Sequence, residues 1–372
     1  MTEHRTYVVG APLGLGPART HLDLGPEHPT RSGAVEIVTE IEGDVITRAE
    51  VRPGRIHRAA EKLFEVRDYR QVLALADRHD WQGSFAGELG VALTVEAALG
   101  LQAPERAVWL RTLLAEHTRL HSHLGFLTYA ARRGTETGDA VSSLREALRE
   151  QLADLSGNRV HPMLTRLGGL AADAAPEWLE AEVRLVRAVA ALTPALRQCV
   201  SALPPGVAVM PTEVVSDFGV TGPAARAAGV DVDLRRSAPY LAYADLDLTS
   251  ASGQEGDAVA RLRCWVDELA PTAALVEQLA AGLTTRPGPV DVMLPKVVRV
   301  PEGETYVATE SPLGRSGWWL VSRGEKQPWR LKMRTASFAH VSALEAVLPG
   351  TPVEHLGLAV ASVGYVVGDL AK

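Results

Sequence analysis

The longest helical pattern in the chain is the run APERAVWLRTLLAEHTRLHSHLGFLTYAARR, residues 103–133. Pro104 suits the first turn of such a helix. Its apolar stripe consists of Leu110, Leu113, Leu114, Leu120, Leu124 and Leu127. Two further runs, 139–157 and 175–200, carry Leu, Val and Ala at the same spacing. Helices of this kind bury their stripes against one another, so the sequence predicts a bundle of long helices from about residue 84 to 203.

Strand patterns flank this helical region. Residues 34–51, AVEIVTEIEGDVITRAEV, alternate on both sides of Glu42-Gly43-Asp44, which predicts a hairpin. Residues 304–335 predict strand, turn, strand, turn, strand, and residues 253–283 predict another long helix. Shorter helices are predicted at 54–65, 67–81 and 84–101, the last of them buried because it is apolar or small on every side.

The predicted fold class is therefore α+β and mainly α. It combines a long-helix bundle with a small N-terminal antiparallel sheet and a C-terminal mixed β region. We expect a single domain over 1–372, with the strand hairpin in 1–53, the helical bundle in 54–203 and a mixed α/β remainder in 204–372.

Composition and charge exclude several classes of protein. The chain has 372 residues, 46% hydrophobic and 22% charged, which is the balance of a soluble globular protein. A net charge of −7 without a basic stripe argues against nucleic-acid binding. Cys199 and Cys264 form no C-x-x-C, so the usual ligands of zinc ribbons and iron–sulfur clusters are missing, and a reducing, cytoplasmic compartment fits. We expect no signal peptide, and no segment reaches the ~20 apolar residues of a membrane span, so a membrane link would come through a partner.

Local motifs alone leave the chemistry open. Neither the P-loop nor the dinucleotide fingerprint occurs, and no Gly-x-Ser-x-Gly elbow is present. His117 and His121 share one face of the predicted helix, so a metal site is one interpretation. No carboxylate completes a hydrolytic HExxH pattern, and hydrogen-bonded helix histidines are the favoured interpretation. Glu116 and Arg119, three positions apart, predict an ordinary ion pair.

Several less common sequence blocks follow one another over nearly the full chain. They are GPEHPTRSG (25–33), EGDVITRAEVRPGRIHRAAEKLFE (42–65), YRQVLALADRHDWQGSFAGELGVALTVEAALGLQAPERAVWLRTLLAEHTRLHSHLGFL (69–127), RLGGL (166–170), GVTGPAARAAGVDVDLRRSAPY (219–240) and YVATESPLGRSGWWLVS (306–322). In this order they resemble the family of D-type subunits of NADH-quinone oxidoreductase, the 49-kDa-type subunit of respiratory complex I. That family is in turn similar to the large subunit of nickel–iron hydrogenases.

The resemblance implies a peripheral-arm subunit of a proton-translocating NADH-quinone oxidoreductase, on the cytoplasmic side of the cell membrane. The implied partners are the B-type iron–sulfur small subunit, a C-type subunit and an H-type subunit of the membrane arm. Electrons would pass from the partner's iron–sulfur cluster to a quinone, the substrate. This chain would bind no metal and no flavin, and NADH would bind to other subunits.

Hydrogenase chemistry is not expected. A nickel–iron centre needs two closely spaced pairs of thiolates. By the resemblance these pairs would fall near ADRHDWQGSF (76–85) and SVGYVVGDLAK (362–372), and neither segment contains a cysteine.

The resemblance also implies a quinone site. A rigid, proline-bounded turn at 25–33 would carry polar side chains into a quinone chamber. The family's first His is kept as His28, but its second His aligns with Ser32, its Tyr with Trp81, and the Asp that orients the second His with Arg133. The expected quinone-binding residues are His28, Thr30, Ser32, Asp80, Trp81 and Arg133, and no catalytic residue is assigned.

These departures remove the family's usual proton donors. A serine hydroxyl does not titrate near neutral pH, and the Trp81 indole donates a hydrogen bond without an acidic proton. His28 could take over as donor, and His57 and His79 lie nearby in the sequence. Two interpretations stay open: a quinone site with altered contacts, or a divergent, non-catalytic scaffold paralogue in a partial or specialised complex I-like assembly.

Overall fold

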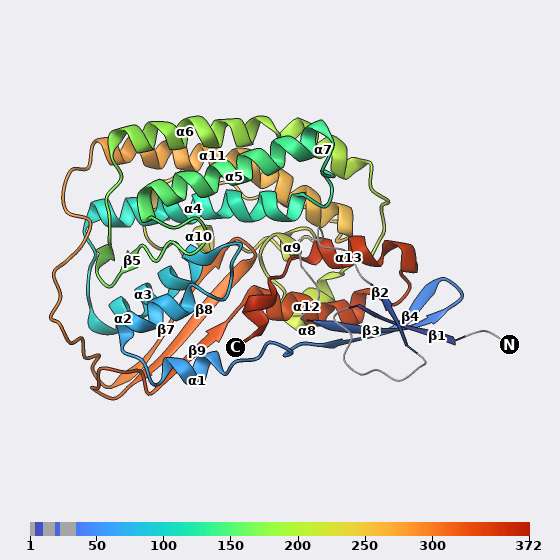
Figure 1. Ribbon diagram of the computed structural model, residues 1–372, viewed down its shortest axis with the longest axis horizontal. Helices are drawn as coiled ribbons and strands as arrows, with labels where there is room; N and C mark the ends of the chain where they lie inside the picture. Colours follow the sequence, from blue (N-terminus) through green and yellow to red (C-terminus); the bar gives the residue numbers. More distant parts are fainter. Residues whose placement is uncertain (1–3, 10–18, 23–34) are drawn as a thin grey trace.

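The computed structural model describes residues 4–9, 19–22 and 35–372. Its largest feature is a layer of long helices that run side by side over the rest of the molecule (Figure 1). The layer contains α4 (Glu105–Leu127), α5 (Glu136–Ser156), α6 (Pro176–Ala191), α7 (Thr193–Ser201) and α11 (Ala258–Thr284). The predicted helix bundle is therefore confirmed. It includes α11, which packs along α4 and α6 although it comes from the C-terminal half of the chain.

Below the helical layer lies an antiparallel three-stranded sheet with the order β7-β8-β9. Its strands are β7 (Gly303–Ser311), β8 (Gly314–Ser322) and β9 (Arg330–Arg334), as the sequence predicts. Helix α3 (Ser84–Leu99) packs on β7, β8 and α4, which explains its small and apolar composition. A Cβ added at Gly90 would lie 2.3 Å from the Trp318 indole nitrogen, so only glycine lets this helix approach β8 so closely.

The predicted N-terminal hairpin is also confirmed. Strands β3 (Glu36–Glu42) and β4 (Val45–Arg52) pair antiparallel across a turn in which Gly43 has a φ of +64°. β1 (His4–Val9) extends this sheet antiparallel to β3, and β2 (Arg19–Leu22) pairs parallel with β1. The helix predicted at 54–65 is shorter than expected: α1 spans Ala60–Phe64, because Ala59 adopts a left-handed φ of 52°.

The C-terminal helices connect the two sheets. Helix α12 (Ala336–Val347) packs on β4 of the N-terminal sheet and also contacts β8, while α13 (Leu356–Val363) packs on α11. The remaining elements are α2 (Tyr69–Ala76), β5 (Thr165–Arg166), β6 (Gly169–Leu170), α8 (Thr212–Phe218), α9 (Gly222–Arg226), α10 (Leu234–Ser237) and the 3-10 turns η2 (Tyr243–Asp245), η3 (Val353–His355) and η4 (Val367–Leu370).

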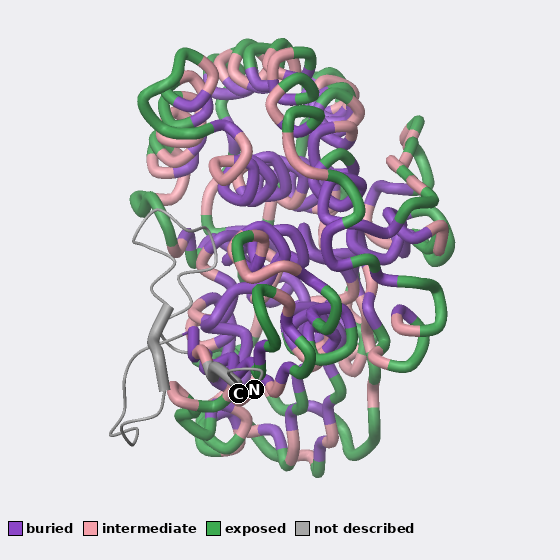
Figure 2. Tube along the Cα trace, turned by 90° about the vertical axis from the view of Figure 1, so that its right-hand side faces the viewer, coloured by how far each residue is buried: buried purple, intermediate pink, exposed green. Residues whose placement is uncertain are grey.

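Buried chain runs through the interior between the layers, and exposed chain lies on the outer loops and helix faces (Figure 2). Among the described residues, no helix is both long enough and apolar enough to cross a membrane.

Candidate functional site

Two segments that are far apart in the sequence meet in the interior. One is the loop 77–83 between α2 and α3, and the other is the C-terminal segment 364–371, which contains η4. The buried His79 donates from Nδ1 to the carbonyl oxygen of Gly368 at 3.2 Å. A Cβ added at Gly368 would lie 2.1 Å from the carbonyl oxygen of His79 and 2.7 Å from the Trp81 ring. Loop 77–83 and segment 364–371 therefore lie in direct contact.

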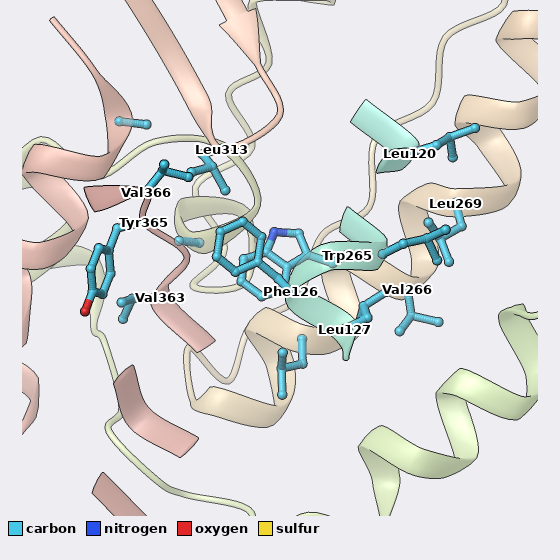
Figure 3. Close-up of a cluster of buried hydrophobic side chains, with 14 of the residues drawn as sticks. Leu120, Phe126, Leu127, Trp265, Val266, Leu269, Leu313, Val363, Tyr365 and Val366 are labelled. Atoms are coloured by element: carbon cyan, nitrogen blue, oxygen red, sulfur yellow. The ribbon is translucent and has the colours of Figure 1, made fainter. Parts of the chain in front are cut away.

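An apolar cluster anchors the C-terminal segment from the other side. Figure 3 shows Val366 beside Leu313, with Tyr365 on the left of the view and Phe126 of α4 and Trp265 of α11 in its centre. The Phe126 and Trp265 rings pack with their centroids 5.1 Å apart. The position of the segment is therefore fixed by the core of the helical layer.

Asp80 begins the turn that leads into α3. Its Oδ1 accepts hydrogen bonds from the backbone N–H groups of Gln82, at 2.9 Å, and Gly83, at 2.8 Å. The side chain is buried, and burial raises the pKa of Asp80 to about 6 although these two hydrogen bonds oppose the shift. Asp80 therefore shapes the loop and titrates close to neutral pH.

Asp369 of η4 is buried beside Asp80. Its Oδ2 accepts a hydrogen bond from Ser337 Oγ of α12 at 2.7 Å. Burial, followed by the negative charge of Asp80, raises the pKa of Asp369 well above its usual range. We call Asp80 and Asp369 the carboxyl pair. Neither forms an ion pair within the described parts of the chain.

Both members of the carboxyl pair line one small cavity of about 20 Å³, which has room for about one water molecule. His79 is the third titratable side chain in its wall, and Ser311, Ser316 and Thr335 supply hydroxyl groups. Burial lowers the pKa of His79, so its imidazole is neutral at pH 7. The cavity is too small for a quinone ring and suits a water that bridges polar groups.

Trp81 is half-buried and lines a second cavity, of about 10 Å³, together with His117 and His121 of α4. His121 Nδ1 donates to the carbonyl oxygen of Gln82 at 2.9 Å, and Arg149 Nε donates to His121 Nε2 at 3.1 Å. This pattern requires a neutral ring. It agrees with a pKa of His121 that burial and the nearby charges of Arg145 and Arg149 hold well below its usual range.

His117 is engaged at both nitrogens as well, by Glu182 Oε1 at 2.8 Å and by the carbonyl oxygen of Leu148 at 3.1 Å. The structure thus supports hydrogen-bonded histidines over a metal site in this row. In the described part of the chain, no cluster of three or more His, Cys, Asp or Glu side chains is arranged to hold a metal ion.

A larger group of buried charges lies between α4, α11 and the end of β7. Arg226 of α9 donates from Nη1 to Glu310 Oε1 at 3.1 Å and from Nη2 to Glu268 Oε1. Arg235 of α10 donates from Nη1 to Glu116 Oε2 at 3.0 Å. With these we group Arg119 and Asp233 and call the seven residues the arginine network.

The arginine network places three guanidinium groups among four acidic side chains. Arg235 also donates to Asp233 Oδ2 at 2.7 Å. Burial alone would raise the pKa values of Glu116, Asp233 and Glu268, but the neighbouring arginines outweigh it and hold all three below the usual range. Glu310 is the exception, since burial leaves its pKa raised despite Arg226.

Arg119 connects this network to the small cavity. The predicted pair with Glu116 is present, with Arg119 Nε 3.1 Å from Glu116 Oε2, but it lies inside the protein. The same guanidinium donates to the carbonyl oxygens of Glu310, at 2.8 Å, and Ser311, at 3.1 Å. Because Ser311 lines the small cavity, the network holds one of the cavity walls in place.

The structure brings together only some of the residues expected at the quinone site. Asp80 and Trp81 lie beside the C-terminal segment, whereas Arg133 lies in the exposed turn between α4 and α5. His28, Thr30 and Ser32 lie outside the described residues. His57 lines an open surface groove together with Lys372.

Sequence reasoning missed Asp369 and Ser337. A signal for Asp369 was available, because segment 362–372, near which the resemblance would put the second thiolate pair, contains this acid and no cysteine. Ser337 left no such signal, since its contact with Asp369 depends on how α12 packs.

Comparisons with known proteins agree with this architecture. The family model described as "Respiratory-chain NADH dehydrogenase, 49 Kd subunit" matches residues 140–299 and 292–372. A chain of the membrane-bound sulfane sulfur reductase, an archaeal respiratory membrane complex, superposes with a TM-score of 0.86 and 30% identity. That match covers 94% of this chain and 97% of that one.

Curated relatives extend over nearly the whole chain. The second D-type subunit of the NADH-quinone oxidoreductase of Salinispora tropica is 43% identical over 359 residues, 94% of this chain and 92% of the relative. The first D-type subunit of the Streptomyces coelicolor enzyme is 43% identical over 375 residues, covering 97% and 98%. The D-type subunit of the Granulibacter bethesdensis enzyme is 33% identical over 385 residues, covering 94% and 96%.

Proposed function

Because this chain belongs to the family of the 49-kDa, or D-type, subunits of NADH-quinone oxidoreductase, we propose that it forms one wall of the quinone chamber in such a complex. The observation that carries this proposal is the contact between loop 77–83 and segment 364–371. It gathers an indole face and two buried carboxyl groups around one glycine, at the place where related hydrogenases would hold their metal.

The proposed quinone contacts come from loop 77–83, from residues 28–32 and from Arg133. Trp81 offers a stacking face and an N–H donor, and Asp80 holds its loop in shape. Thr30 and Ser32 supply hydroxyl groups, and His28 supplies a ring nitrogen, for the quinone carbonyls. Arg133 contributes positive charge at the outer rim. It is expected to attract the reduced, negatively charged forms of a quinone.

In this proposal the chain works as part of an assembly. A B-type iron–sulfur small subunit delivers electrons to the quinone, and C-type and H-type subunits connect the peripheral arm to the membrane. The arm lies on the cytoplasmic side, and quinone reduction drives proton translocation in the membrane arm. NADH oxidation belongs to other subunits.

The test compares two activities of the purified complex, NADH oxidation with quinone and NADH oxidation with an artificial acceptor that bypasses the quinone. The variants are Trp81→Ala and Ser32→Ala. The matched control is Trp329→Ala, which removes an exposed indole from the turn between β8 and β9. We expect kcat/KM for quinone to fall at least about tenfold in both site variants, with the artificial-acceptor rate unchanged.

Two results would contradict the proposal. Wild-type rates with quinone in both site variants would place the quinone elsewhere. A native complex that reduces the artificial acceptor but never quinone would instead support the scaffold interpretation.

A further inference from the structure

The small cavity has an unusual wall for a protein interior. Two carboxyl groups face it from segments 289 positions apart, and neither has a cation as an ion-pair partner within the described ranges. Asp80 uses Oδ1 for two backbone N–H groups, and Asp369 uses Oδ2 for the Ser337 hydroxyl. These hydrogen bonds leave Asp80 Oδ2 and Asp369 Oδ1 for a water in the cavity.

We propose that the carboxyl pair binds one exchangeable proton and delivers it, through a water in the small cavity, to a quinone bound beside Trp81. This inference rests on the proposed function and names the proton donor of that same site. Two like charges that share a buried space do not ionise together, because burial and mutual repulsion both disfavour the second charge. One proton therefore stays on the pair at neutral pH.

The surroundings of the pair favour this role. His79 is neutral and donates to Gly368, so it does not compete as an acid. Among the described residues, Lys372 is the one cation whose charge opposes the raised pKa of Asp369, and it lies beyond ion-pair distance. From α12 and the β7–β9 sheet, the cavity wall receives hydroxyl and apolar side chains, and no further charge comes from these described elements.

Quinone reduction needs a proton donor near the quinone, and the carboxyl pair lies near the proposed quinone position. Trp81 packs against Gly368, the residue before Asp369, so a quinone beside the indole would lie close to the pair. Because Ser32 and Trp81 replace a titrating His and Tyr, the chain offers no other acid at those two positions.

A quinone becomes a quinol by taking two electrons and two protons. The electrons arrive one at a time from the iron–sulfur carrier of the assembly, and each adds to the quinone ring. The pair breaks one carboxyl O–H bond and passes that proton, by way of the water, to a reduced quinone oxygen. The pair then regains a proton from solvent and supplies the second.

The experiment measures quinone reduction by the complete complex between pH 6 and pH 9, with the artificial-acceptor rate as a check on assembly and electron supply. The variants are Asp80→Asn, Asp369→Asn and the double variant. We expect kcat of the double variant to fall roughly 100-fold or more, with a much smaller change in KM. Asparagine at position 80 keeps the turn, because its amide oxygen accepts the same backbone hydrogen bonds.

The pH profile separates a proton donor from a structural role. The rate of the native complex falls as pH rises and the pair loses its proton. In Asp80→Asn the negative charge that raises the pKa of Asp369 is gone, so this alkaline decline moves to lower pH. If Asp369→Asn prevents assembly, Asp369→Glu keeps an acid and is expected to retain most of the rate.

The matched control is Glu88→Gln. Glu88 is a buried carboxyl group on the neighbouring helix α3, and it does not line the cavity. The complex that carries Glu88→Gln should have the rate and pH profile of the native complex. A double Asp variant with the native rate and pH profile would overturn the proposed role of the carboxyl pair as proton donor. The proposed quinone site would still stand. A native complex that never reduces quinone would overturn both.

Discussion

The arginine network and the carboxyl pair are almost equally inaccessible to water, yet the protein surrounds them differently. In the network, three guanidinium groups lie among four carboxylates, with contacts such as Arg235 Nη2 to Asp233 Oδ2 at 2.7 Å. Beside the small cavity, Asp80 and Asp369 receive hydrogen bonds and no ion pair in the described part of the chain. In both places burial disfavours the charged form of a carboxyl group. Only in the network do neighbouring arginines offset this cost.

The consequence appears in opposite pKa shifts. Arg226 and His123 outweigh the burial of Glu268 and lower its pKa, whereas burial and Asp80 raise the pKa of Asp369 well above its usual range. A group that is always charged is suited to holding elements together, and a group that changes its charge near neutral pH is suited to chemistry. The two regions share a wall, since Arg119 holds the carbonyl groups of Glu310 and Ser311.

Removing a cation from the arginine network should have the largest effect on stability. Arg226→Met would leave Glu268 and Glu310 buried without their shared partner. We expect the free energy of unfolding to fall by roughly 3–5 kcal/mol, because an uncompensated buried charge costs far more than a broken surface pair. Denaturant unfolding of the variant and native chains at pH 7 measures this difference.

Arg187→Met is the matched control for that variant. Arg187 pairs with Glu277 at 2.5 Å, but its side chain is 63% exposed. Its removal should cost only about 0–1 kcal/mol. Equal losses in the two arginine variants would show that the network is no more important than a surface ion pair.

Much of the fold is predictable because long elements repeat a simple pattern. Helix α4 and the β7–β9 strands follow from side-chain periodicity over many residues. The start of α1 does not, since the left-handed backbone of Ala59 has no marker such as glycine. The place of α11 within the helical layer is equally hidden, because periodicity gives the apolar face of a helix and not its partner.

The site is less predictable than the fold. Asp80 and Trp81 were found through family alignment, but Glu116 and Arg119 look like any surface pair three positions apart. Their partners come from positions 235 to 311, and no local pattern shows that these charges meet inside the protein. Burial of a charge is a property of tertiary packing, and one sequence does not encode it in any short stretch.

Glu88 is a buried acid that lies outside both regions. Its Oε1 accepts from the backbone N–H groups of Leu164 and Thr165, and its Oε2 has no hydrogen-bond partner among the residues that the structure describes. Burial, followed by the charge of Asp77, raises its pKa from 4.5 to about 8. A carboxyl group whose pKa is raised by folding makes its full contribution to stability at pH values below its pKa in the unfolded chain. This contribution is lost as pH rises through about 8.

Glu88→Gln should therefore stabilise the chain at alkaline pH. We expect its free energy of unfolding to exceed that of the native chain by roughly 2–4 kcal/mol at pH 8–9, and the gain to shrink towards zero near pH 4.5. Denaturant unfolding at several pH values measures it. A difference that does not change with pH would mean that Glu88 is ionised throughout and resembles the carboxylates of the arginine network.

Ser337→Ala makes the smallest change to the carboxyl pair. The Ser337 hydroxyl donates to Asp369 Oδ2 at 2.7 Å and accepts from the backbone N–H of Val366 at 3.1 Å. Its loss should cost about 1–2 kcal/mol of stability, against less than about 0.5 kcal/mol for Ser342→Ala, a more exposed serine of the same helix. Because the hydroxyl lowers the pKa of Asp369, its removal should move the alkaline decline of quinone reduction to higher pH, opposite to Asp80→Asn. A move to lower pH would show that Asp369 does not set this decline.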